Sequence, residues 1–214
     1  MNNRRQVLAA LAALASAEVW AQEVSQPSLT PEQLREAMKT QLPPPPEGFA
    51  WQIYKNAVFP KPAGWTEREL AAPPSRVTMS TYATSPEAFS QTKPFETGFT
   101  VQIITGSKRT LNFEARRMAL AYVKPFLDSH RKDEILLLEQ KPSGDFEQTF
   151  FRYRDAPPGL KPVIVHKFIL ANDKADTVHI FTFESPAETW DANWSKFGTP
   201  ILSRVNVVPQ AAAN

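Results

Sequence analysis

The sequence predicts an α+β protein, in which an antiparallel β-sheet is covered by two main helices as an α/β sandwich. Most of residues 48–208 follow the period of two that β-strands produce. Two long stretches, at 112–129 and 185–197, instead carry apolar residues at helical spacing. Turn signals separate the strand-like stretches, so consecutive strands are expected to pair as antiparallel hairpins.

The expected strands follow one another along this domain. The first spans Phe49 to Phe59, after which Pro60 to Trp65 turn the chain. A short helical turn is expected at Ser85, which caps it, with Pro86 at its first position. The other strands are expected at Val77–Ala83, Phe99–Thr105, Glu134–Gln140, Phe146–Tyr153, Pro162–Leu170, Thr177–Phe183 and Ile201–Val207.

The strand at 162–170 indicates that the sheet is buried on both faces. One set of its alternate residues includes Phe168 and Leu170, and the other set includes Val165 and Ile169. A strand with one face in water would alternate apolar residues with polar ones, so we expect layers on both sides of this sheet.

The long helix is expected at Asn112–Ser129, with Arg116 and Arg117 off its apolar stripe. Pro125 should kink its last turn or end it, because proline lacks the backbone N–H. The stripe consists of Phe113, Met118, Ala119, Tyr122 and Phe126.

The second helix is expected to begin at Ser185-Pro186-Ala187-Glu188. This run has a capping serine, a proline at the first position and a glutamate that completes a capping box. Its apolar stripe consists of Trp190, Trp194 and Phe197.

Composition excludes several classes of protein. The 214 residues include 24 Lys and Arg, 22 Asp and Glu, and no cysteine. Without cysteine there is no disulfide scaffold, cysteine zinc site, thiolate nucleophile or lipid anchor on cysteine. A formal net charge of +2 gives no basic field of the kind that nucleic-acid binding requires, so no nucleic-acid partner is expected.

Residues 1–21 have the pattern of a cleavable signal peptide. Arg4 and Arg5 precede an apolar run and then small residues, and this run is too short for a permanent membrane span. Cleavage is expected after Ala21, with Ala17 as the alternative. The two arginines fit a twin-arginine signal and an ordinary secretory signal about equally. Either signal predicts a periplasmic or secreted protein, and no later apolar stretch is long enough to span a membrane.

Residues 22–47 are expected to form an arm before the domain at 48–208. Thr30 and Pro31 begin a short helix, whose apolar face holds Leu34 and Met38. The four prolines at 43–46 form a stiff spacer. Residues 209–214 are expected to be a disordered tail.

No catalytic constellation is visible among the histidines and serines. None of His130, His166 and His179 has metal-ligand spacing to another histidine. If Leu170 pairs with Val178, His166 and His179 point to opposite faces and cannot share a ligand. Ser143-Gly144-Asp145 is expected as a hairpin turn, because no G-x-S-x-G elbow surrounds the serine.

Oxygen ligands and glycines likewise point to turns rather than to sites. Asn172, Asp173 and Asp176 could offer oxygens to calcium, but they lack the alternating positions of a calcium loop. We therefore expect a solvated turn there. Seven glycines leave no phosphate-cradling loop. We expect no catalytic, metal-binding or cofactor-binding residue, and no cofactor.

Two groups of side chains could serve recognition. Trp51 and Trp65 lie near turns and could stack on a ligand, although burial in the core is favoured. The most basic stretch could bind an acidic partner, although a solvated helix face is favoured. Its members are Arg109, Arg116, Arg117, Lys124, His130, Arg131 and Lys132.

Residues 49–208 resemble the PsbP-like proteins, the group around an extrinsic subunit of photosystem II. The resemblance is carried by Phe59-Pro60 with Gly64-Trp65, by Phe95 to Val101, and by the long helix. It is carried most clearly by the C-terminal motifs Phe181-Thr182-Phe183-Glu184-Ser185-Pro186, Trp190-Asp191 and Pro200-Ile201-Leu202-Ser203. These are turns, caps and core aromatics, which specify a fold rather than an activity.

The resemblance implies a non-catalytic binding or assembly role in an exported compartment. No ligand-binding residue of the group can be matched to this chain one by one. Three hypotheses follow. The first is an exported protein that binds a protein partner, and peripheral contact with a membrane complex is one form of this role. The second is a small-ligand carrier, and the third is an enzyme with an unrecognised site. The first hypothesis predicts that residues 22–47 contribute to partner binding.

Overall fold

The computed structural model describes Glu36 and residues 42–70, 76–89, 97–156 and 161–208. The expected signal peptide, the expected tail and the arm before residue 42, apart from Glu36, lie outside these residues. Those expectations therefore stay predictions.

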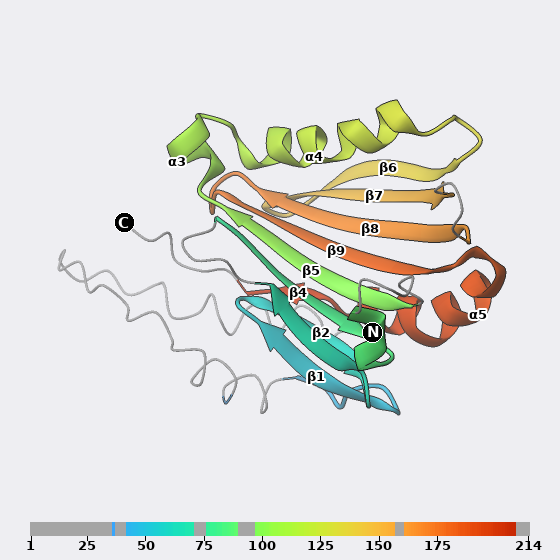
Figure 1. Cartoon of the computed structure of the whole chain (residues 1–214). Helices are drawn as coiled ribbons and strands as arrows, with labels where there is room; N and C mark the ends of the chain where they lie inside the picture. The colour runs from blue at the N-terminus through green and yellow to red at the C-terminus, as the bar shows by residue number, and fades with distance from the viewer. Residues whose placement is uncertain (1–35, 37–41, 71–75, 90–96, 157–160, 209–214) are drawn as a thin grey trace, which may run out of the picture.

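Seven strands form the main antiparallel sheet (Figure 1). Their order across the sheet is β3-β4-β5-β9-β8-β7-β6, so β3 and β6 are the two edges. The strands are β3 (Thr66–Leu70), β4 (Val77–Ala83), β5 (Gly98–Thr105), β6 (Ile135–Ser143), β7 (Phe146–Asp155), β8 (Val163–Asn172) and β9 (Thr177–Pro186).

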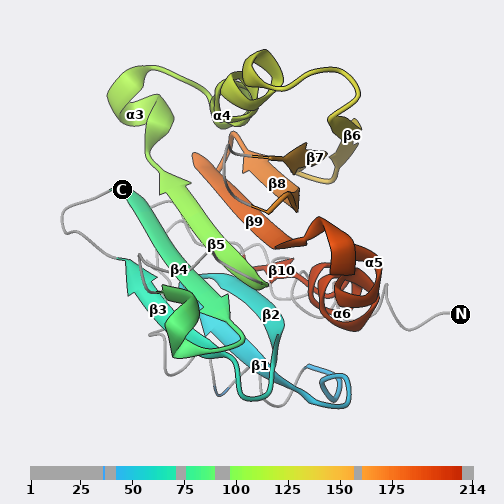
Figure 2. The same ribbon diagram turned by 45° about the vertical axis from the view of Figure 1, so that its right-hand side comes forward.

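One face of this sheet carries helix α4 (Ala115–Ser129), which the short helix α3 (Ser107–Leu111) precedes. The opposite face carries a three-stranded sheet and a C-terminal helical run (Figures 1 and 2). The small sheet has the order β1-β2-β10, from β1 (Phe49–Tyr54), β2 (Ala57–Pro62) and β10 (Asn206–Val207). The helical run consists of η2 (Ala187–Thr189), α5 (Trp190–Asn193), the π-helical η3 (Trp194–Gly198) and α6 (Thr199–Leu202).

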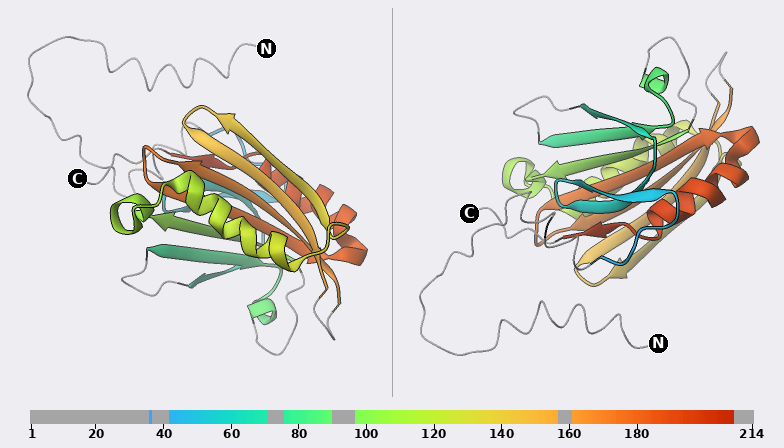
Figure 3. Two further views of the ribbon diagram at one scale, coloured as in Figure 1. Left: turned by 90° about the horizontal axis from the view of Figure 1, so that it is seen from above. Right: turned by 90° about the horizontal axis from the view of Figure 1, so that it is seen from below.

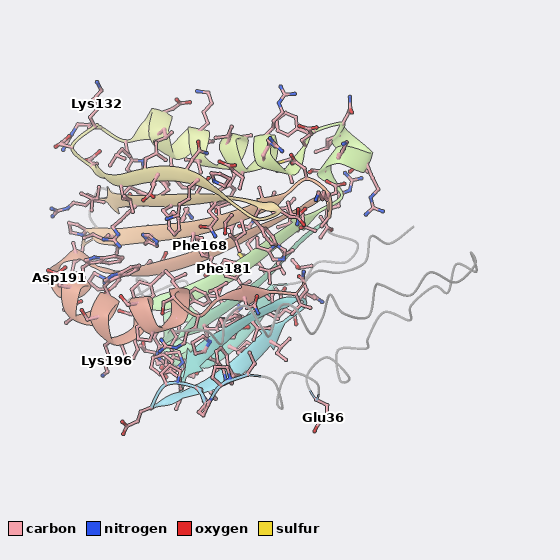
Figure 4. All side chains as sticks on the ribbon, turned by 180° about the vertical axis from the view of Figure 1, so that it is seen from behind. Glu36, Lys132, Phe168, Phe181, Asp191 and Lys196 are labelled. Carbon is pink, nitrogen blue, oxygen red and sulfur yellow. The ribbon has the colours of Figure 1, made fainter. Side chains whose placement is uncertain are left out.

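The central strands of the main sheet, β8 among them, are buried on both sides, as the sequence of 162–170 predicts. On the α4 side, Ala115, Ala119 and Val123 pack against Phe151 and Ile180. On the other side, rings from both sheets and the C-terminal run form an aromatic core; they include Phe59, Tyr82, Phe99, Phe168, Phe181 and Trp190. Figure 4 shows Phe168 and Phe181 in this interior layer. The predicted α+β class is confirmed.

The N-terminal and C-terminal elements differ from the prediction. The stretch at 49–59 is not one strand, because the chain turns at Lys55-Asn56 and pairs with itself as β1 and β2. β3 was not expected, since its sequence is polar and lies at a sheet edge. The last strand is only Asn206–Val207, and Ile201 belongs to α6. There Ile201 is fully buried as part of the helical face.

Both expected helices form, with different ends. α4 continues through Pro125 to Ser129, so the proline does not end the helix there, and the kink stays a prediction. Ser185 lies in β9 and forms no capping box; its hydroxyl accepts a hydrogen bond from Asn193 Nδ2 at 2.8 Å instead. A short 3-10 helix, η1 (Pro86–Phe89), occupies the expected helical turn after Ser85.

Gly198 is required where the C-terminal run packs on itself. Its backbone is ordinary right-handed helix, so a side chain there meets no backbone strain. However, a Cβ on Gly198 would lie well inside contact distance of Trp194 Cε3 and 3.0 Å from Cζ3. The Trp194 ring has little freedom to move, because it stacks on Trp190 with centroids 5.2 Å apart.

We predict that Gly198→Ala lowers the free energy of unfolding by about 1–3 kcal/mol, the range for overpacked sites. Helix propensity alone would favour alanine by about 1 kcal/mol, so a loss isolates the clash with Trp194. Chemical denaturation measures the change. The control is Lys196→Ala on the outer side of the same run (Figure 4), which should stay within about 0.5 kcal/mol of wild type. An alanine variant as stable as wild type contradicts the prediction.

Candidate functional site

An apolar groove runs between α4 and the edge strand β6, with a volume of about 380 Å³. Leu120 and Leu127 line it from α4, and Leu138 lines it from β6. These leucines are 51%, 36% and 49% exposed, respectively. Figure 3 shows α4 lying across the sheet with β6 beyond it on one side. The groove is therefore a gap in the coverage of the sheet.

The groove wall on the helix side is a second stripe next to the buried one. Its members recur every three or four residues, which places them on one side of a helix. They are Phe113, Arg117, Leu120, Lys124 and Leu127. Leucines and cations alternate along this wall, so its character is amphipathic rather than uniformly apolar.

The opposite wall belongs to β6, which has no neighbouring strand on its outer side among the described residues. Leu138 pairs with Phe151 and Gln140 pairs with Thr149, which places both on the α4 face. Gln140 Nε2 donates to Thr149 Oγ1 at 3.2 Å and closes the floor of the groove. The register of β6 shifts between Ile135 and Leu137, so β6 begins with an irregularity.

Most of the predicted basic stretch is occupied by ion pairs with neighbouring carboxylates. Arg116 binds Asp173, and Lys124 binds Asp128 four residues later at 2.6 Å. The remaining pairs are Lys108–Glu114, Arg109–Asp176, His130–Asp155 and Arg131 with Asp133 and Glu134. The Arg117 guanidinium instead lies over the Phe113 ring, 5.3 Å from its centroid, and among the described residues it has no ion pair. The groove thus holds a cation without a carboxylate.

A buried lysine fastens α4 to the sheet. Lys167 Nζ donates to Tyr122 Oη at 3.2 Å and to Thr182 Oγ1 at 3.3 Å, and it lies 4.9 Å from the Phe126 ring centroid. Burial lowers the pKa of Lys167 to about 8. Burial also raises the pKa of Glu184 to about 6, although the charge of Lys167 opposes that rise. α4 is therefore held by polar as well as apolar contacts.

The three histidines do not form one site, but the reason differs from the prediction. Leu170 pairs with His179 rather than with Val178, so His166 and His179 point to the same face of the sheet. They remain separate because His166 pairs with Phe183, further along the strands. His130 lies near α4 and contacts Asp155 at 3.9 Å. The one-residue change in register reverses every side chain of the expected hairpin.

Each buried histidine has its own structural partner. Arg152 Nε donates to His166 Nδ1 at 3.2 Å, and the guanidinium lies 4.3 Å from the Trp194 ring centroid. His179 Nε2 donates to Asn56 Oδ1 at 2.9 Å, while its Nδ1 is buried without a partner. Burial lowers the pKa of His166 to about 3 and that of His179 to about 4.

The acidic turn between β8 and β9 is not merely solvated. Asp176 accepts hydrogen bonds from Ser107 Oγ at 3.0 Å and from the backbone N–H of Lys108 at 2.8 Å. Asp173 accepts the backbone N–H of Arg116 at 2.9 Å. The two carboxylates therefore satisfy N–H groups at the starts of α3 and α4, which is the role of helix caps.

The remaining candidates are structural. Trp65 is buried in the aromatic core, and Trp190 stacks there with Trp194. Trp51 is half-buried, and its Nε1 donates to the Pro43 carbonyl at 2.8 Å, so the proline spacer lies against β1. Ser143 ends β6 beside the hairpin turn at Gly144, as expected.

A second, polar hollow of about 350 Å³ lies on the other face of β7 and β8. Arg154, Lys161 and Glu188 line it, and Lys161 pairs with Glu188 at 3.0 Å. The described residues include no group of three or more His, Cys, Asp or Glu that could hold a metal ion. No helix in the described part of the chain is long and apolar enough to cross a membrane.

Comparison with models of protein families and with curated proteins finds no match. Solved structures do match. Cyanobacterial PsbP (CyanoP) from Synechocystis is 16% identical, with a TM-score of 0.48, over 75% of this chain and 93% of that protein. The Ran-binding protein Mog1p from Saccharomyces cerevisiae is 12% identical, with a TM-score of 0.45, over 75% of this chain and 95% of that protein.

The expected resemblance to the PsbP-like proteins is confirmed at the level of the fold alone. At these identities and TM-scores the likeness carries no argument about activity. The groove between α4 and β6 is defined by this chain's own residues. Sequence reasoning missed it, although one signal was present: Leu120 and Leu127 lie seven residues apart beside the buried stripe.

The two buried histidines predict an acid-sensitive fold. Between pH 6.5 and about 4 an unfolded histidine binds a proton, whereas folded His179 stays neutral. The unfolded state then binds more protons, so stability falls as the pH falls through this window. The difference for His179 corresponds to roughly 3 kcal/mol. Glu184 acts in the opposite direction between about pH 4.5 and 6, because its folded pKa is raised.

We therefore predict that His179→Gln, which keeps an N–H donor for Asn56, weakens the loss of stability between pH 6.5 and 4. Denaturant unfolding at a series of pH values measures this slope. Gly198→Ala is the control, because it lowers stability without removing a titratable group and should keep the wild-type slope. A His179→Gln slope equal to that of wild type would show that His179 is not the cause.

Proposed function

We propose that this chain is an exported, non-catalytic protein that acts by binding a protein partner through the groove between α4 and β6. Export rests on the expected signal peptide at residues 1–21. The binding role rests on one observation, the exposure of three leucines that line a single groove. Contiguous apolar surface on a folded protein is typical of interaction sites.

The exposed leucines are unfavourable in the unbound protein. Complete burial of a leucine is worth about 1.5–3 kcal/mol, so each half-exposed leucine would contribute about 1 kcal/mol on burial. The sheet on the other side of α4 is more polar, since β4 and β5 present Thr81, Thr100 and Gln102 there, with Val77, 37% exposed, on the same face at the start of β4. The apolar surface is thus concentrated at the β6 edge, which supports a specific contact at that place.

The carrier hypothesis has weaker support. The groove volume of about 380 Å³ lies within the range of small-ligand sites. Such sites enclose the ligand and aim a few polar groups at it. This groove lies on the surface, and Gln140, a polar group on its floor, is already bonded to Thr149. The side chains of a partner protein, laid along the surface, fit this groove better than an enclosed small molecule.

We predict that Leu138→Asp abolishes capture of the partner by cross-linking and pull-down from cells that export the protein. The matched control is Leu111→Asp, because Leu111 is 61% exposed and does not line the groove. The control should capture the same partner as wild type. Equal capture by both variants would contradict the groove as the contact. A bound small molecule in native mass spectra, with no protein partner, would favour the carrier hypothesis.

The arm needs a separate variant. A chain that lacks residues 22–41 but keeps the spacer against Trp51 reports whether the arm adds to the contact. Loss of the partner in this variant and in Leu138→Asp would indicate a two-part interface, and loss in Leu138→Asp alone would confine the contact to the groove.

A further inference from the structure

The cations on the groove wall have a defined spacing. Arg117 and Lys124 are seven residues apart on α4, which separates their backbones by about 10.5 Å at 1.5 Å per residue. Leu120 lies between them, and Leu127 follows one turn after Lys124. The wall therefore presents a cation, an aliphatic group, a cation and an aliphatic group in sequence.

We propose that the occupant of this groove is an acidic amphipathic helix that lies along α4, with two carboxylates about 10.5 Å apart. The inference rests on the proposed function, because it names the partner class for the same groove. Two acidic residues seven positions apart on the partner helix fall on one face, two turns apart, and reach Arg117 and Lys124. Its apolar residues between them cover Leu120 and Leu138.

Charge complementarity carries this choice. Arg117 has no ion pair among the described residues, and the Phe113 ring holds its guanidinium at the groove. Lys124 already pairs with Asp128, but the two side chains are 71% and 60% exposed. An exposed pair of this kind is weak, so a partner carboxylate can share or replace Asp128. Both cations are thus available to an acidic ligand.

The edge strand β6 is a poor template for an added strand. Its register is irregular at its start, and Lys141 and Pro142 lie toward its end. Bulges, edge lysines and edge prolines are the features that discourage pairing with another strand. A helix needs no hydrogen bonds from β6 and uses only its side chains, so it fits this edge where an extended peptide does not.

A second copy of this chain fits the groove poorly when the contact is centred on the middle of the stripe. In a two-fold dimer the same stripe meets itself, so residue i of one copy faces residue j of the other, and residue j faces residue i. Antiparallel packing centred between Leu120 and Ala121 places Arg117 of one copy opposite Lys124 of the other. Like charges would then meet at both ends of the contact, which is unfavourable. A separate, acidic partner removes this repulsion.

The test is selection from a displayed library of helical peptides against the mature chain. Every member has a fixed leucine seam, and the positions beside the seam vary among Glu, Lys, Gln and Ala. We expect enrichment of glutamate at two positions seven residues apart. The enriched peptide should bind the double variant Arg117→Glu, Lys124→Glu at least about tenfold more weakly, and its lysine counterpart should regain affinity for that variant.

The control is Lys132→Glu, which changes a charge in the loop between α4 and β6 that extends from the molecule (Figure 4) and does not line the groove. This variant should bind the enriched peptide as wild type does. The proposal of an acidic helix is overturned if the selected peptides carry lysine at these positions, if they carry uncharged residues there, or if no peptide is enriched. Binding only by peptides that fail to form helix, judged by circular dichroism, overturns it in favour of strand addition. Preference for anionic vesicles over every peptide overturns it in favour of a membrane surface.

The same experiment separates the two proposals. If the selected peptides are lost with Leu138→Asp but carry no acidic pair, the groove is a binding site and only the acidic helix is wrong. If they bind Leu138→Asp as they bind wild type, the groove itself is not the site, and the proposed function fails together with the inference.

Discussion

One helix cannot cover one face of a seven-stranded sheet. Strands lie about 4.8 Å apart, so seven of them span roughly 29 Å, whereas a helix with its side chains is about 10–12 Å wide. α4 packs on β9, β8 and β7, the fourth, fifth and sixth of the seven strands. The strands on the two sides of α4 are therefore left without a covering layer on this face, and each side meets solvent with its own set of side chains. The character of each uncovered margin follows from this geometric constraint.

The two uncovered margins differ in the polarity of the side chains that they expose. Toward β4, Thr81 Oγ1 and Thr100 Oγ1 lie 3.2 Å apart and present hydroxyls beside α4. Toward β6, the uncovered surface is made of leucines from both the helix and the strand. A margin in which threonines accompany a single exposed valine, Val77, gains less free energy on being covered than a margin of three leucines. The asymmetry between the margins is what separates the groove from ordinary surface.

The opposite face of the main sheet has no such uncovered margin at its centre, because the small sheet and the C-terminal helical run cover it together. The small sheet and the C-terminal run enclose Phe99, Phe181 and Phe183 completely. At the outer end of this layer the Arg152 guanidinium lies over Trp190 and Trp194, with centroids 5.0 and 4.3 Å away. A cation on an aromatic surface can close a core at the boundary with water, since its ends stay hydrated.

The sequence predicted the elements whose pattern is local. Val77–Ala83 reads as a strand in the sequence, and the structure places β4 at those residues. The sequence alone could not predict β3. A polar edge strand such as Thr66–Leu70 carries no apolar pattern, and it forms only because it pairs with β4. The register of β8 against β9 was missed by one residue for a similar reason. Both strands are apolar on both faces, so alternation does not fix their pairing.

The candidate site was harder to predict than the fold, because it arises between elements distant in sequence. Leu120 and Leu138 each look like ordinary core residues when they are taken alone. Their exposure becomes visible only when α4 lies over β7–β9 and leaves the β6 edge open. The basic stretch was visible in the sequence, but its meaning was not. Carboxylates from the β8–β9 turn and from α4 itself bind three of its seven members, Arg109, Arg116 and Lys124.

The cations that remain at the groove serve the unbound protein as well as the bound one. An uninterrupted leucine stripe beside an open sheet edge would favour association with other copies and with unfolded chains. Arg117 and Lys124 interrupt that stripe at every second turn and make the contact between identical stripes repulsive when it is centred between Leu120 and Ala121. The same charges would favour a helix that carries carboxylates at matching positions over one that lacks them. Selectivity and solubility thus have one physical cause here, which is the alternation of leucine and cation along a single side of α4.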